Sequence, residues 1–333
     1  PAIKVLLALS TSLLLTLSFP NYNQSWLAWL ALVPVIIACS SGGPISSFAL
    51  GLLSGTVAAF GNFQWIFEVS GFRWYHFVIL GCYLGLYPAL WCSGLSTLKH
   101  RRHLSVITVP ALWCVLDYVK AHVGFMAFPW GSLAQSQHDN LQLIQLASYT
   151  GEYGVTFLIV MTNYVIAVSI LHKTWRILIL PGLVLVAVHS WGATLISSNN
   201  VGRQLKVSVV QPNILRHERK SEDDFEKSVN HLAALTVSSV SAHPELVVWP
   251  ETAVKNLETE PVLLKKVRSI SQTVNAPIIT GSSEVFKFAE RTEQQNSVQF
   301  NNRMYNSAYF ISPDEPRVEN YRKRLLVPFS EYI

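Results

Sequence analysis

The sequence predicts a polytopic α-helical membrane domain over residues 1–200, followed by an extracytoplasmic α/β domain over residues 201–333. Three observations predict this fold class. Only 14% of the side chains are charged and 50% are hydrophobic, whereas an ordinary soluble domain is about 25% charged. Residues 1–200 hold 8 Lys and Arg and 4 Asp and Glu, while the rest of the chain holds 17 and 16. Long apolar stretches in the first part give way to short apolar strands alternating with helical segments.

Composition excludes several other classes of protein. The high apolar content, with 17 Gly and 16 Pro, excludes intrinsic disorder and collagen-like repeats, and four cysteines are too few for a disulfide-stapled domain. The net charge of +5 arises mainly in the membrane part, so no nucleic-acid partner is expected. No metal and no cofactor are expected either, because the ten His form no ligand spacing and no glycine-rich loop follows a strand.

Seven apolar stretches predict seven membrane-spanning helices. A hydrocarbon core about 30 Å thick requires roughly 20 apolar helical residues. The stretches cover approximately residues 3–19, 25–40, 46–63, 77–96, 104–119, 153–171 and 177–197. The fifth stretch is short and carries Asp117 near its end.

Basic residues between these stretches predict the orientation. Lys99, Arg101 and Arg102 follow the fourth stretch, and Lys173 and Arg176 follow the sixth. Short cytoplasmic loops are enriched in Lys and Arg, and an odd-even count puts both loops on the same side. After seven crossings, residues 201–333 are therefore expected on the extracytoplasmic side.

A long segment from about residue 120 to 152 is expected on that same side. It contains Phe128, Pro129 and Trp130 in sequence, and it ends at Glu152. Long loops in compact folds are more often functional than idle. These four residues are therefore candidate substrate or loop contacts, and the alternative is a re-entrant support.

Strands and helices alternate in the second part, which predicts a layered α/β domain with its chemistry at the strand ends. The expected strands are Lys206–Val210, Glu245–Trp249, Ala276–Thr280 and Ser307–Ile311, and the expected helices are residues 221–241 and Pro261–Val274.

Glu251 follows the second expected strand directly after Trp249 and Pro250. A carboxylate there is expected to be partly desolvated, which would raise its pKa toward the range of a general base. The alternative is a residue beside a helix N-cap or a salt-bridged residue at the rim. Trp249 is a further candidate contact for a substrate or loop.

Lys323 lies in the segment Tyr321–Tyr332, which combines three cations, an apolar run and the carboxylate of Glu331. A Lys on a rigid segment that is anchored by Pro328 stabilises a developing oxyanion. The alternative is a solvated basic turn.

Two motifs give the chain a resemblance to a known family. Trp249-Pro250-Glu251 and Tyr321-x-Lys323-x-x-Leu326-Val327-Pro328-Phe329-x-Glu331 resemble the apolipoprotein N-acyltransferases, bacterial inner-membrane enzymes of the nitrilase superfamily. Supporting matches are Leu17-Ser18-Phe19-Pro20, Phe128-Pro129-Trp130, Val210-Gln211-Pro212-Asn213, Thr280-Gly281 and Tyr305-Asn306-Ser307. Together and in this order they extend over essentially the whole chain.

The resemblance implies a nitrilase-like α-β-β-α sandwich and an acyl transfer in two steps. A cysteine thiolate would take a fatty acyl chain from a phospholipid and pass it to the N-terminal amine of a diacylglyceryl-cysteine lipoprotein. By motif, Glu251 would be the general base, Lys323 the oxyanion stabiliser and Glu331 an accessory carboxylate. The implied location is the bacterial inner membrane, with the α/β domain on the periplasmic side.

In the family that this chain resembles, the cysteine nucleophile is expected further along the chain than Glu331, but the sequence ends at Ile333. The four cysteines present are Cys39, Cys82, Cys92 and Cys114. All four lie in predicted spans, where an apolar setting disfavours the thiolate. We therefore expect a C-terminally incomplete chain that is inactive as given.

Two other functions are compatible with parts of the sequence. A membrane-tethered nitrilase-like amidase or hydrolase would share the Glu and Lys but use water as the acceptor. A polytopic transporter or sensor with an extracytoplasmic domain would not be an enzyme and would use neither the Glu nor the Lys in catalysis. Few charged residues in the spans and no evident inverted repeat disfavour the transporter.

Overall fold

The computed structural model describes residues 1–69, 71–98, 102–198, 202–214, 222–292, 297–315, 318–324 and 326. The chain divides into two compact units, unit 1 over residues 1–200 and unit 2 over residues 201–333. Each unit is described by itself.

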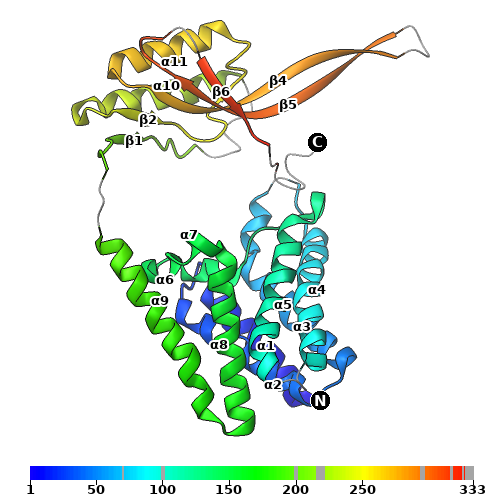
Figure 1. The fold of residues 1–333 in the computed structure, drawn as a ribbon. Helices are drawn as coiled ribbons and strands as arrows, with labels where there is room; N and C mark the ends of the chain where they lie inside the picture. Colours follow the sequence, from blue (N-terminus) through cyan, green and yellow to red (C-terminus); the bar gives the residue numbers. More distant parts are fainter. Residues whose placement is uncertain are drawn as a thin grey trace. The chain divides into compact units, whose positions relative to one another are not determined.

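Unit 1 is entirely helical among its described residues (Figure 1). The long helices are α1 (Ala2–Ser18), α3 (Pro44–Asn62), α4 (Trp74–Leu98), α5 (Arg102–His122), α8 (Glu152–His172) and α9 (Ile179–Ser197). Shorter α-helices are α2 (Val33–Ser40), α6 (Leu141–Ile144) and α7 (Ala147–Thr150). Single 3₁₀ turns are η1 (Ser25–Trp29), η2 (Gln64–Glu68), η3 (Gly124–Met126), η4 (Leu133–Gln137) and η5 (Trp175–Leu178).

Five helical segments of the described chain are long and apolar enough to cross a membrane. They are Pro44–Asn62, Trp74–Leu98, Leu104–His122, Glu152–His172 and Trp175–Ser197. The segments Ala2–Ser18 and Ser25–Ser40 are apolar but shorter. Several apolar helices of this length make the chain a multi-pass membrane protein. The count of seven crossings stays a prediction.

The expectation of one continuous helix over residues 25–40 was wrong. The segment consists of η1 and α2, with Pro34 in the first turn of α2. Asn163 of α8 compensates for the break, because its Oδ1 accepts a hydrogen bond from the Leu32 amide at 2.8 Å and its Nδ2 donates to the Ala28 carbonyl at 2.9 Å. Backbone groups freed inside a membrane domain require such internal partners.

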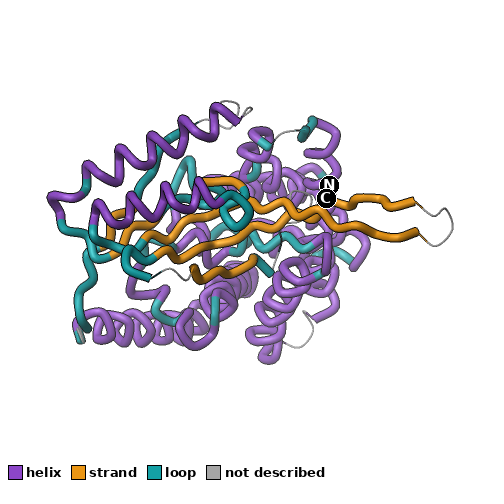
Figure 2. Tube along the Cα trace, turned by 90° about the horizontal axis from the view of Figure 1, so that it is seen from above, coloured by secondary structure: helices purple, strands orange, loops and turns teal. Residues whose placement is uncertain are grey.

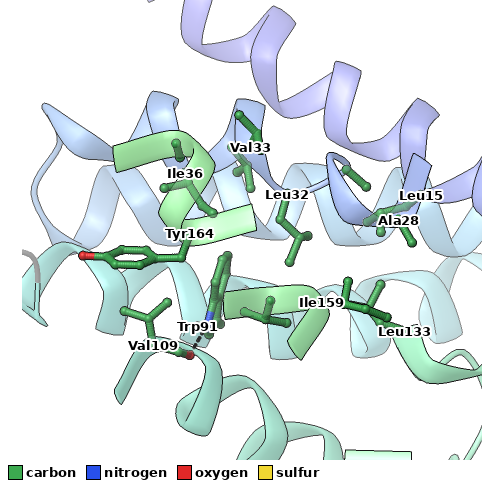
Figure 3. Packing of buried hydrophobic residues seen from close by; sticks show 14 of the residues in the cluster. Leu15, Ala28, Leu32, Val33, Ile36, Trp91, Val109, Leu133, Ile159 and Tyr164 are labelled. Atoms are coloured by element: carbon green, nitrogen blue, oxygen red, sulfur yellow. Dashed lines mark hydrogen bonds between the residues drawn. The ribbon is translucent and has the colours of Figure 1, made fainter. Parts of the chain in front are cut away.

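The core of unit 1 forms where α8 packs against α2 and α5. Figure 3 shows Leu32, Trp91 and Ile159 meeting there, and the Trp91 indole donates to the Val109 carbonyl at 3.0 Å. Helix α8 is buried on nearly all sides, whereas most apolar side chains of α9 are exposed. The apolar surface of α9 therefore suits contact with lipid.

Unit 2 is an α/β unit built on a six-stranded mixed sheet. The strands are β1 (Val207–Val209), β2 (Leu246–Val248), β3 (Val254–Lys255), β4 (Ile278–Thr292), β5 (Ser297–Ile311) and β6 (Val318–Arg322). The order is β1-β2-β4-β5-β6, and β3 pairs with β4. The pairings of β1 with β2, β2 with β4 and β3 with β4 are parallel, while those of β4 with β5 and β5 with β6 are antiparallel.

Helices α10 (Glu222–Ser238) and α11 (Pro261–Val274) contact each other and pack against one face of this sheet. That face carries Val247, Ile278 and Ile311, which are fully buried. Both helices were expected, α11 with the same bounds. We call the face that they cover the helix-covered face and the other the open face.

The strand predictions were right in position but wrong in length. Strands β4 and β5 form a hairpin of fifteen residues each, which extends far beyond the rest of the sheet (Figures 1 and 2). Their inner ends lie on the buried core, and their outer parts are polar and show no apolar alternation in the sequence. Residues 318–322 form strand β6, which pairs with β5 and was not among the predicted strands.

Candidate active site

The structure brings Glu251 and Lys323 together, although 72 residues separate them. The Lys323 ammonium lies 3.2 Å from Oε1 of Glu251. Asn306 donates from its amide nitrogen to the same oxygen. A carboxylate that follows β2 and an ammonium that follows β6 therefore converge on an amide within β5.

Strand register explains this convergence. The Lys323 amide donates to the Asn306 carbonyl at 2.8 Å, which places the two residues opposite each other where β5 meets β6. Ser307 pairs with Arg322, so Asn306 and Lys323 lie on the face opposite to Ser307. Tyr309 and Ile311 share the face of Ser307, which is the helix-covered face. The cluster of Glu251, Asn306 and Lys323 therefore lies on the open face.

The turn that carries Glu251 depends on a close approach to Gly281 of β4. A Cβ atom at Gly281 would lie 2.7 Å from the Glu251 Cα and 2.6 Å from the Thr252 amide nitrogen. The Gly281 amide also donates to the Pro250 carbonyl at 3.1 Å. Thr252 has a positive φ of 51°, so the chain turns sharply just after the carboxylate.

The expected partial burial of Glu251 was wrong for the described residues. Its side chain is 64% exposed, and that of Lys323 is 30% exposed. The physical reason is the position on the open face, beyond the reach of α10 and α11. Trp249, the neighbour expected at the site, is buried instead, and its indole donates to the Thr236 hydroxyl of α10 at 2.9 Å. Trp249 thus holds the strand end against the helix layer.

The candidate contacts in unit 1 gather at one end of α5. Phe128 is buried, and its ring meets those of Phe63 and Trp130 edge-on at centroid distances of 5.0 and 4.9 Å. Gln135 connects the other two candidates, because its Nε2 donates to the Pro129 carbonyl at 3.2 Å and to the Glu152 carboxylate at 3.3 Å. The segment is thus packed and hydrogen-bonded rather than an open loop.

Beside this segment lies a cavity of about 90 Å³ in unit 1. Aromatic and aliphatic side chains provide most of its lining, together with a buried ion pair in which the Lys120 ammonium lies 2.6 Å from the Asp117 carboxylate. Lys120 also donates to the Trp130 carbonyl at 3.1 Å. Among the described residues, the second carboxylate oxygen of Asp117 has no hydrogen-bond partner. Asn62 also lines the cavity, and its side-chain oxygen likewise has no hydrogen-bond partner among the described residues, so the cavity combines apolar walls with unsatisfied acceptors.

Sequence reasoning missed three of these residues. Asn306 was part of a matching motif but had no assigned role, since its contact with Glu251 depends on strand register. Asp117 and Lys120 could have been found from their spacing, because i and i+3 meet on one face of a helix. Glu331, Lys99 and Arg101 lie outside the described residues.

Comparison with known proteins identifies both units. Residues 11–165 match the family model of the apolipoprotein N-acyltransferase N-terminal domain, and residues 206–333 match that of carbon-nitrogen hydrolase. A protein of Geobacter metallireducens named apolipoprotein N-acyltransferase is 30% identical over 98% of this chain and 64% of its own length. The chain belongs to the apolipoprotein N-acyltransferase family.

Other members of the apolipoprotein N-acyltransferase family are similar over the same range. The proteins of that name from Photobacterium profundum and Chlorobaculum tepidum are 24% and 25% identical, over 99% and 98% of this chain. The chain spans 64% of the length of each of these three relatives. The carbon-nitrogen hydrolase match contains Glu251 and Lys323, and the N-terminal match contains the cavity of unit 1.

Proposed function

We propose that the full-length protein transfers a fatty acyl chain from a phospholipid to the N-terminal amine of a diacylglyceryl-cysteine lipoprotein. The observation that carries this proposal is the contact of Glu251 with Lys323 and Asn306 in a carbon-nitrogen hydrolase domain. The names of the relatives and the apolar helices support a lipidated acceptor and a donor drawn from the membrane.

The proposed first step acylates a cysteine. Glu251 accepts the thiol proton, the thiolate attacks an ester carbonyl of the phospholipid, and a C–S bond forms as the ester C–O bond breaks. The lysophospholipid leaves as an alcohol and takes the proton from Glu251. Lys323 stabilises the negative oxygen of the tetrahedral intermediate.

The proposed second step repeats this chemistry with a different nucleophile. The lipoprotein amine attacks the thioester, a C–N bond forms, the C–S bond breaks and the amine proton passes to Glu251. None of the four cysteines of the chain lies in unit 2.

Replacing Glu251 tests the proposal directly. Glu251→Gln in the full-length protein keeps the shape of the side chain but removes the base, so thioester formation should fall by roughly 10²-fold or more. The matched control is Glu260→Gln, at an exposed glutamate nine residues along, which should leave the rate unchanged.

The measurement is a gel assay of hydroxylamine-sensitive acyl-enzyme formed from labelled phospholipid. A normal rate for Glu251→Gln would assign the carboxylate to structure. Release of free fatty acid with no transfer to a lipoprotein amine would instead support a hydrolase.

We propose a location in the bacterial inner membrane with unit 2 in the periplasm. The support is the pair of basic loops, of which Lys173 and Arg176 are described at the turn between α8 and α9. In a cysteine-free background, a cysteine at Lys173 should be protected from an impermeant thiol reagent in spheroplasts. A cysteine at the exposed Val262 of α11 should react. The opposite labelling pattern would reverse the orientation.

A further inference from the structure

A second polar cluster of unit 2 lies on the helix-covered face, behind the candidate active site. Its centre is the carboxylate of Glu258, in the loop between β3 and α11. One oxygen of Glu258 accepts hydrogen bonds from the Tyr309 hydroxyl at 2.9 Å, the Asn320 amide at 3.3 Å and the Arg322 guanidinium at 3.3 Å. A single carboxylate thus connects the loop to both β5 and β6.

The donors to Glu258 are held in place by their own surroundings. Tyr309 is buried, and this burial is the largest cause of a raised pKa of its phenol; the hydrogen bond to Glu258 is the second. The hydroxyl therefore remains a donor at neutral pH. The Arg322 guanidinium lies 4.7 Å from the ring centroid of Tyr305 and 5.1 Å from that of Phe286. The two rings and the carboxylate together fix its plane.

This cluster and the candidate active site share one strand. Side chains alternate along β6, so Asn320 and Arg322 point to the helix-covered face while Lys323, directly after the strand, points to the open face. Among the described residues, β6 pairs only with β5. Contacts at Asn320 and Arg322, together with the packing of Val318 against the core, therefore restrain the strand that leads to Lys323.

We propose that Glu258 is a positioning residue, which clamps β6 through Asn320 and Arg322 so that Lys323 lies against Glu251. The inference rests on the proposed function, in which Lys323 stabilises the oxyanion. Glu258 touches no reacting atom. Its effect on the rate arises from placement, to which catalysis is sensitive at the level of about 1 Å.

The experiment compares Glu258→Gln with the matched control Glu260→Gln in the full-length protein. The first readout is structural: a water-soluble carbodiimide joins a carboxylate and an amine in contact as an amide, and peptide mass spectrometry quantifies the link between residues 251 and 323. Glu258→Gln should reduce this link several-fold, while the control should form it in full yield.

The second readout is thioester formation from phospholipid. Glu258→Gln should lower kcat by roughly ten-fold and leave KM unchanged, because the side chain acts on Lys323 and not on lipid binding. Arg322→Gln leaves the carboxylate in place and removes its strongest partner on β6. It should reproduce both effects, so the test does not depend on the folding of one variant.

The outcomes separate the two proposals. A normal cross-link in both variants overturns the positioning role, whatever the rate. A weakened cross-link with a normal rate supports positioning by Glu258 but contradicts the role of Lys323 in acyl transfer. A weakened cross-link with a lower kcat supports both.

Discussion

The two units each hold a close pair of a lysine and a carboxylate, and the pairs differ in almost every other respect. In unit 1, Asp117 and Lys120 are three residues apart on one helix, and their side chains are only 8% and 11% exposed. In unit 2, Glu251 and Lys323 come from distant segments and lie on the open face. Helix geometry brings the first pair together, and its burial determines how much the ion pair affects stability. Strand register brings the second pair together.

This difference indicates which pair contributes to stability and which is accessible for chemistry. A buried ion pair is poorly compensated when one partner is lost, so it constrains the fold. An exposed pair contributes little to stability but leaves its groups accessible to a substrate. The comparison assigns Asp117 and Lys120 to holding the segment around Trp130, and Glu251 and Lys323 to chemistry.

Removing one partner of the buried pair should have the largest effect on stability. Asp117→Asn leaves the Lys120 ammonium buried without its counter-charge and should cost about 3–5 kcal/mol of unfolding free energy. The measurement is equilibrium unfolding of the full-length protein in mixed micelles. The double variant Asp117→Leu/Lys120→Met removes both charges and should recover most of the loss. A cost below about 1 kcal/mol for Asp117→Asn would mean that the pair behaves like a surface pair.

Asn163→Leu should cause a smaller loss of unfolding free energy. It removes both hydrogen bonds from Asn163 to the helix break before α2. The Leu32 amide and the Ala28 carbonyl would lose their partners, at about 1–2 kcal/mol each. The matched control is Thr162→Val on the same helix, because the Thr162 hydroxyl bonds only to its own helix at Leu158 among the described contacts. Equal losses for the two variants in the same unfolding assay would show that the break needs no side-chain support.

The smallest effect concerns an exposed pair of unit 2, Glu245 and Arg203, whose charged atoms lie 3.0 Å apart. Two hydrogen bonds lower the pKa of Glu245 below its ordinary value of 4.5, and the one from Arg203 has a larger effect than the one from the Lys206 amide. A lowered pKa stabilises the folded state at pH values above the ordinary pKa of the group. This stabilisation is lost as the pH falls through the folded-state pKa.

Glu245→Gln should therefore reduce the melting temperature slightly at neutral pH and not at all at strongly acid pH. Thermal melting of the full-length protein between about pH 3 and about pH 7 measures this. A loss that persists at the acid end would show that the side chain acts through packing instead of charge.

Sequence patterns were sufficient for elements whose stability is local or continuous along the chain. Helix α11 was predicted with its observed bounds, since Pro261 marks its first turn and apolar residues repeat on one face. The helix break near Pro34 was missed, because it depends on the side chain of Asn163 about 130 residues away. The length of the β4–β5 hairpin was missed because its outer part, which pairs through the backbone, shows no apolar alternation in the sequence.

The sequence by itself determined that the first 200 residues form apolar helices, that an α/β unit follows, and that Glu251 and Lys323 are the residues to examine. Hydrophobic length, alternation and motif spacing are properties of neighbouring residues, so a single chain records them. Only the tertiary structure decided that Asn306 completes the cluster, that Glu251 is exposed while Trp249 is buried, and that Glu258 lies behind Lys323. These facts depend on the register of β5 against β6 and on which face the helices cover, and both are set by contacts between segments far apart in the sequence.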